Sequence, residues 1–118
     1  MSQYDNPANQ RRAERKRASA AAIVTDVISG QPMGHLGNLS SSGMLLIGAQ
    51  TPRSEALYQV SVALPEADQG AAPPQSIEVG IQEQWHEPAT SGQVWAGYRI
   101  VAIGEEDVSR LDRWLATP

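Results

Sequence analysis

The sequence of 118 residues contains no cysteine and no phenylalanine. The lack of cysteine excludes disulfide bonds and thiolate metal ligands, which agrees with a reducing compartment. With only three tryptophans and three tyrosines, a hydrophobic core must be built mainly from aliphatic side chains. No apolar run approaches the roughly 20 residues of a membrane-spanning helix, and the polar start lacks the apolar stretch of a secretory signal. We therefore expect a cytoplasmic protein with no membrane insertion.

The length of the chain predicts one domain with a single core. Residues 1–10 are polar and have no apolar periodicity, so we expect them to be a disordered N-terminal segment. The structured domain is expected to occupy residues 11–118.

Positive charge is scarce and concentrated in one place. The net charge is -4, but the segment "RRAERKR" (11–17) has five basic residues and one acidic residue, a local charge of +4. The rest of the chain therefore carries a charge of -8. An acidic body argues against a nucleic-acid polymer as partner, because that requires a basic surface wide enough to contact many phosphates. The segment is either a solvated tail or a site for a partner with few negative charges.

Most of the chain reads as short strands separated by glycine- and proline-containing segments, which is typical of an all-β barrel or sandwich. Alternating apolar positions indicate two half-buried strands, one with Tyr58, Val60, Val62 and Leu64 on one face, the other with Ile77, Val79, Ile81 and Trp85. The continuously apolar "MLLIG" predicts a strand covered on both faces. The segment "QVWAGYRIVAI" predicts a long final strand.

The C-terminal segment "GEEDVSRLDRWLATP" predicts a helix of about ten residues. Its acidic residues lie at the start and its arginines toward the end, as the helix dipole favours. Val108, Leu111 and Leu115 share one helical stripe, with Trp114 beside it. We expect this stripe to pack against the sheet or to plug an open end of a barrel.

Two short motifs carry the functional hypothesis. Arg11 and Arg15 are four residues apart and Arg12 is close by, so they could reach one ligand. A guanidinium group is planar and permanently charged, and it can stack on a base, bind the guanine edge or pair with phosphate. These properties suit a small dianionic guanine nucleotide.

The second motif is "NLSSSG", from Asn38 to Gly43. Its short polar side chains can hydrogen-bond an anion, and Gly43 permits positive φ, so the segment could present backbone N–H groups in a concave turn. A plain β-turn between two strands is the simpler alternative.

Taken together, these motifs resemble the signature of the PilZ family, RxxxR followed by [D/N]xSxxG. Arg11, Arg15, Asn38, Ser40 and Gly43 occupy all five signature positions. The resemblance continues through the later apolar strands and the acidic-start helix. Asn38 stands where many members have Asp, which replaces a carboxylate by an amide that accepts fewer hydrogen bonds.

The resemblance implies a six-stranded antiparallel β-barrel with a C-terminal helix, acting as a bacterial receptor for the second messenger cyclic di-GMP. By position, Arg11 and Arg15 would clamp the ligand with help from Arg12. The contacts from the barrel side would be Asn38, Ser40 and Gly43. The N-terminal arm, which is the segment that carries these arginines, would change conformation on binding and signal to a partner protein. The alternative is a nucleotide-independent adaptor for pilus, flagellar or polysaccharide machinery.

Trp85 is expected first to pack in the core or at the barrel rim, because it shares a face with buried-type residues. The alternative is that its ring stacks on a guanine. We expect no catalysis, because the sequence has no recognisable nucleophile, phosphate-binding or metalloprotease motif. His35 and His86 lack metal-ligand spacing, so we expect no metal site and no cofactor besides the nucleotide ligand.

Overall fold

The computed structural model describes residues 16–17, 22–64 and 75–116. Its elements are β1 (Lys16–Arg17), β2 (Ile23–Asp26), β3 (Pro32–Leu39), β4 (Gly43–Gly48), β5 (Leu57–Leu64), β6 (Gln75–Pro88), the short 3-10 helix η1 (Thr90–Gly92), β7 (Val94–Ile103) and α2 (Glu105–Ala116). Within these residues, no helix is long and apolar enough to cross a membrane. The proposed division at residues 10 and 11 lies outside them.

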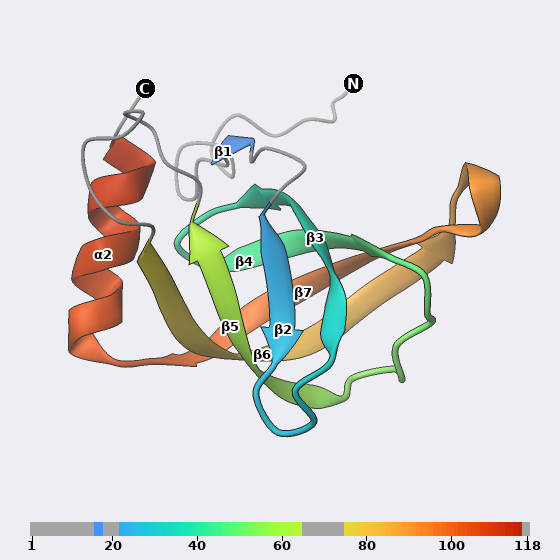
Figure 1. Cartoon of the computed structure of the whole chain (residues 1–118), viewed down its shortest axis with the longest axis horizontal. Helices are drawn as coiled ribbons and strands as arrows, with labels where there is room; N and C mark the ends of the chain where they lie inside the picture. The colour runs from blue at the N-terminus through green and yellow to red at the C-terminus, as the bar shows by residue number, and fades with distance from the viewer. Residues whose placement is uncertain (1–15, 18–21, 65–74, 117–118) are drawn as a thin grey trace.

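Strands β2 to β7 form a closed antiparallel barrel (Figure 1). The hydrogen-bonded order is β3-β2-β5-β6-β7-β4, and an additional β3–β4 pairing closes the ring. The two-residue strand β1 pairs with the end of β3. The prediction of a six-stranded antiparallel barrel with a C-terminal helix is therefore confirmed.

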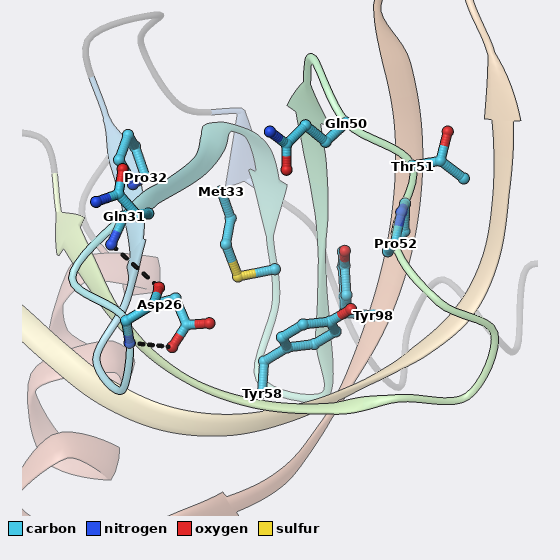
Figure 2. A pocket seen from close by; sticks show the side chains of 10 residues that line it. Asp26, Gln31, Pro32, Met33, Gln50, Thr51, Pro52, Tyr58 and Tyr98 are labelled. Atoms are coloured by element: carbon cyan, nitrogen blue, oxygen red, sulfur yellow. Dashed lines mark hydrogen bonds between the residues drawn. The ribbon is translucent and has the colours of Figure 1, made fainter.

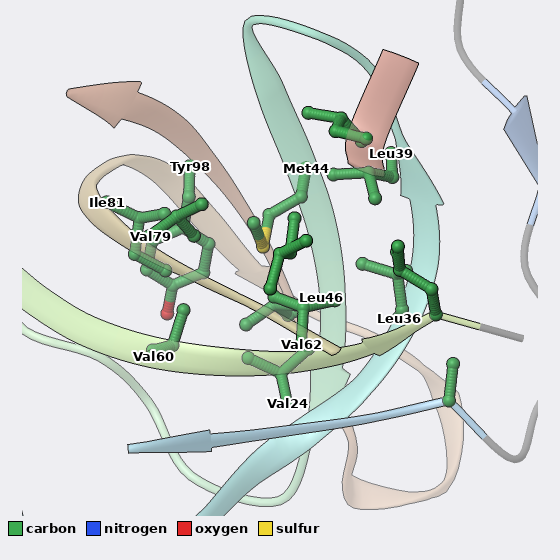
Figure 3. Close-up of a cluster of buried hydrophobic side chains, with 14 of the residues drawn as sticks. Val24, Leu36, Leu39, Met44, Leu46, Val60, Val62, Val79, Ile81 and Tyr98 are labelled. Atoms are coloured by element: carbon green, nitrogen blue, oxygen red, sulfur yellow. The ribbon is translucent and has the colours of Figure 1, made fainter. Parts of the chain in front are cut away.

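The barrel interior is filled by aliphatic side chains from every strand of the ring (Figure 3). In β5, the inward residues Val60 and Val62 are fully buried, as the alternating pattern predicts. Burying one such side chain stabilises the fold by about 1.5–3 kcal/mol relative to leaving it exposed. In β4, Met44 and Leu46 are buried but Leu45 is half-exposed, so the expected coverage of both faces is only partial.

The close approach of β3 and β4 depends on two glycines. A Cβ atom added to Gly34, whose φ is +155°, would lie 2.6 Å from the carbonyl oxygen of Ile47. A Cβ atom on Gly48 would collide with the carbonyl oxygen of Met33. Only glycine lets the two backbones come this close, so the barrel closes at this point.

A β-bulge corrects the sequence expectation for Trp85. The register between β6 and β7 shifts between Glu83 and Trp85, because Gln84 is an extra residue in β6. Glu83, before the bulge, continues the inward positions of Ile77, Val79 and Ile81 and is only 2% exposed, whereas Trp85, after the bulge, turns outward and is 47% exposed. Trp85 is therefore on the barrel surface, and its expected place on the buried face of Ile77, Val79 and Ile81 is wrong.

Helix α2 lies beside β6 at one end of the barrel (Figure 1). Its first turn is fastened to the strand by a hydrogen bond of 3.1 Å from the Glu78 N–H to Asp107 Oδ2. Leu111 and Trp114 join the hydrophobic core, whereas Val108 is 38% exposed. The predicted helix is confirmed, but its inward stripe is centred on Leu111 and Trp114 and not on Val108.

Candidate functional site

The turn between β3 and β4 is organised around the buried hydroxyl of Ser40. Its Oγ accepts hydrogen bonds from the N–H groups of Ser42 (3.2 Å) and Gly43 (3.1 Å). The Ser40 N–H in turn donates to the Gly43 carbonyl oxygen at 2.9 Å. Ser40 is fully buried, and its role in the structure is to fix the shape of this turn.

These contacts correct one expectation about the turn. The N–H groups of Ser40, Ser42 and Gly43 are engaged within it, so they do not form an exposed cradle for an anion. Gly43 also does not have positive φ. The residues of the turn that are exposed to solvent are Ser41 and Ser42.

The pairing of β1 brings the basic arm to this turn. Lys16 pairs with Leu39, and Arg17 pairs with Asn38. Arg11, Arg12 and Arg15 lie outside the described residues, but Arg15 directly precedes Lys16 in the chain. Lys16, which follows the arginine motif in the sequence, is therefore at the edge of the second motif.

A pocket of about 250 Å³ lies against the same turn on the outside of the barrel. It is lined by Ser42, Gly43, Gln84, Trp85, Gly97, Tyr98 and Arg99. The Trp85 ring lies over Gly97, where a Cβ atom would collide with the indole nitrogen. Glycine at position 97 therefore lets this large aromatic surface lie flat on the barrel beside the turn.

Sequence reasoning missed Arg99 as a candidate binding residue. Arg99 is exposed on β7, opposite Gly43 of β4 on one side and Gln82 of β6 on the other. Its Nη2 donates a hydrogen bond of 2.9 Å to Gln82 Oε1, which orients the guanidinium group. The alternation in "VWAGYRI" places Arg99 on the same outward face as Gly97, so this signal was present in the sequence.

A buried carboxylate supports β6 beneath this surface. Glu83 Oε1 accepts from the Glu55 N–H at 2.8 Å, and Glu83 Oε2 lies 2.6 Å from His86 Nδ1. The Glu55 amide and then the His86 ring stabilise the charged carboxylate and lower the pKa of Glu83, although burial opposes them. The contact also holds Glu55, which has the strained φ of +60°, against β6.

The surface thus combines an aromatic plane, an oriented guanidinium group and small polar side chains next to a basic segment. Such a set can stack on a base and pair with phosphate. The described residues include no group of three or more histidine or acidic side chains that could hold a metal ion.

No protein-family model matches the sequence, and no curated protein matches it. The fold is similar to the solved structure of the Bacillus subtilis inhibitor of motility, MotI/DgrA, with a TM-score of 0.68 and 16% identity over 89% of this chain and 48% of that one. It is equally similar to a complex of K. pneumonia MrkH with c-di-GMP, with a TM-score of 0.68 and 15% identity over 89% and 50% of the two chains.

A second MrkH structure, described as a c-di-GMP-dependent transcription regulatory factor, has a TM-score of 0.62 and 15% identity over 89% of this chain and 49% of that one. The chain spans about half the length of these neighbours. At this level of identity, the similarity establishes the fold.

Proposed function

We propose that the protein is a receptor for cyclic di-GMP and not an enzyme. The nucleotide would lie between the arginine motif of the arm and the surface formed by the turn, Trp85 and Arg99. The observation that carries this proposal is the β1–β3 pairing, which places Lys16 and Arg17, the residues that follow the arginine motif in the sequence, beside the end of β3 that leads into the turn. The shared fold with a protein solved as a c-di-GMP complex supports it.

Each part of the ligand has a complementary group in this arrangement. Guanine planes suit the Trp85 ring and the guanidinium groups of Arg11, Arg12 and Arg15, and the two phosphates suit the positive charge of the arm. Asn38 is half-buried and would accept from a guanine edge. Gly43 and Ser40 would act through the shape of the turn.

The arm would transmit nucleotide binding to the rest of the signalling pathway. Nucleotide bridging the arm and the barrel would change the conformation of residues 1–15 and so alter the surface offered to a partner protein. The proposal of a protein partner rests on the receptor role and on the PilZ resemblance of the two motifs.

Calorimetric titration of the full chain with cyclic di-GMP tests the receptor role. We expect micromolar or tighter binding, lost in Arg15→Ala and weakened about tenfold or more in Arg99→Ala. Arg53→Ala is the matched control, because it removes one exposed positive charge from the segment before β5 and should leave the affinity within about twofold of wild type.

Absence of heat with folded wild-type protein would overturn the receptor proposal and favour the nucleotide-independent adaptor. Equal losses in Arg53→Ala and Arg99→Ala would instead indicate a general charge effect and remove Arg99 from the site.

A further inference from the structure

A second pocket, of about 160 Å³, opens at the mouth of the barrel (Figure 2). Pro32 and Met33 of β3 form one wall, and the segment from Gln50 to Pro52 after β4 forms the other. Tyr58 and Tyr98 line its inner side, with their rings perpendicular at 79° and their centroids 6.0 Å apart. Neither motif of the nucleotide proposal contributes to this pocket.

The topology of the barrel creates this opening. Pairing of β3 with β4 ends at His35 and Ile47, next to the close backbone approach at Gly34 and Gly48. Before that point β3 pairs only with β2, and after Gly48 the chain leaves the sheet. The two walls therefore diverge, and Figure 2 shows Met33 pointing into the space between them.

The pocket contains a buried polar group that has no hydrogen-bond partner within the described part of the chain. The Tyr98 side chain belongs to a residue only 5% exposed, and none of the residues that the structure describes forms a hydrogen bond with its hydroxyl group. Burial, with additions from Tyr58 and Glu83, raises the pKa of Tyr98, so the hydroxyl keeps its proton and can donate it. The Tyr58 hydroxyl differs, because it accepts a hydrogen bond from the Arg53 N–H at 3.4 Å.

The charge of the lining selects against anions. Asp26 lies at the edge of the pocket, where its Oδ1 accepts from the N–H groups of Ile28 (2.8 Å) and Ser29 (3.3 Å). The residues that line the pocket include no lysine, arginine or histidine. A carboxylate or phosphate ligand would thus meet a negative charge and no positive one.

We propose that this pocket binds a small uncharged ring compound with a hydroxyl or carbonyl group, which accepts a hydrogen bond from the Tyr98 hydroxyl. A cavity of about 150 Å³ can hold benzene, so one six-membered ring with a small substituent fits. The tyrosine rings, Met33 and the two prolines supply apolar contact, and Tyr98 supplies the one directional bond. The proposal does not depend on nucleotide binding.

Titration of the 15N-labelled full chain with phenol, observed by NMR, tests the site. We expect saturable shifts, with a millimolar or lower dissociation constant, at the amides of residues 26–33 and 50–52. Nuclear Overhauser contacts should join phenol to the Met33 methyl group. Toluene, which lacks the acceptor, should bind at least fivefold more weakly, and benzoate should not bind.

Tyr98→Phe removes only the hydroxyl group and keeps the ring that lines the pocket. It should weaken phenol binding at least fivefold and leave toluene binding within twofold. Glu87→Gln, at an exposed position that does not line the pocket, is the control and should leave both unchanged. The proposal fails if phenol causes no saturable shifts at these amides, if Tyr98→Phe binds phenol as well as wild type, or if benzoate binds as tightly as phenol.

Discussion

At the scale of single residues, Ser40 and Glu83 are the buried polar side chains among the described residues when the aromatic ones are set aside. Both hold the backbone of a connecting segment: Ser40 bonds to amides of its own turn, and Glu83 bonds to the Glu55 amide 28 positions away. Removing one partner of a buried hydrogen bond leaves the other unsatisfied, which lowers the stability of the fold. Each contact is therefore best tested by substituting the side chain that accepts the hydrogen bonds.

Glu83→Gln should lower the free energy of unfolding by about 1.5–3 kcal/mol at neutral pH, because it removes the charge from two hydrogen bonds. Urea denaturation measures this loss. Glu87→Gln, at an exposed position of the same strand, is the control and should change stability by less than about 0.5 kcal/mol.

The difference between wild type and Glu83→Gln should depend on pH. Because folding lowers the pKa of Glu83 from its ordinary value of 4.5, the stabilisation is fully present above that pH. It is lost as the pH falls through the lower, folded-state value. Denaturation curves of the two proteins should therefore converge on acidification, and a constant difference down to the acid transition would contradict this account.

Individual site residues could be predicted from the sequence only where a motif marked them. Asn38, Ser40 and Gly43 were proposed from motif spacing and stay predictions as ligand contacts, and the inward direction of the Ser40 hydroxyl depends on turn geometry that the motif does not contain. Arg99 belongs to neither motif, and it reaches the site because β7 pairs with both β4 and β6. Such a position follows from long-range pairing, which the local pattern does not contain.

At the scale of elements, the inward face of α2 gives a direct test of packing. Trp114→Ala should destabilise the protein by about 3–5 kcal/mol, since Trp114 is 8% exposed and belongs to the core cluster. Val108→Ala should cost less than about 1 kcal/mol, because Val108 is 38% exposed and lies outside the core cluster. Thermal or urea unfolding of the two variants measures both changes in stability. Equal destabilisation by the two substitutions would mean that Val108 belongs to the inward stripe, as the sequence predicted.

The strands show why alternation predicts some elements well and misplaces others. In β5 the period of two holds from Val60 to Leu64, and the inward residues were identified correctly. In β6 the same pattern holds up to Ile81, but the bulge at Gln84 reverses the direction of Trp85. One extra residue exchanges the two faces of a strand, and no composition signal marked it.

At the scale of the whole molecule, charge separation should govern nucleotide affinity. The body is acidic while segment 11–17 has a local charge of +4, so this segment supplies most of the attraction for a dianionic ligand. Raising the salt concentration tenfold should weaken cyclic di-GMP binding several-fold, because salt screens the attraction between the positive charges of segment 11–17 and the two phosphates. Calorimetry at a series of sodium chloride concentrations measures this slope, and salt-independent affinity would argue that the arm does not contact phosphate.

The fold as a whole was more predictable than the site. Strand spacing indicated an all-β barrel or sandwich, and the family resemblance narrowed it to the six-stranded barrel that is observed. The pocket between Met33 and Pro52 had no sequence signal, since it arises where paired strands separate and not from a set of residues.

The ribbon of β6 and β7 extends beyond the rest of the barrel and turns at Thr90–Gly92 (Figure 1). Thr90 is exposed, and a Cβ atom at Gly92 would meet nothing within 4 Å. Since the sequence has no cysteine, one thiol introduced at Thr90 would be a unique attachment point for a dye. Trp85 and Trp95 lie along the same ribbon, so quenching of that dye would report changes at the barrel surface around these tryptophans. The dye itself would sit outside the packed core of the barrel.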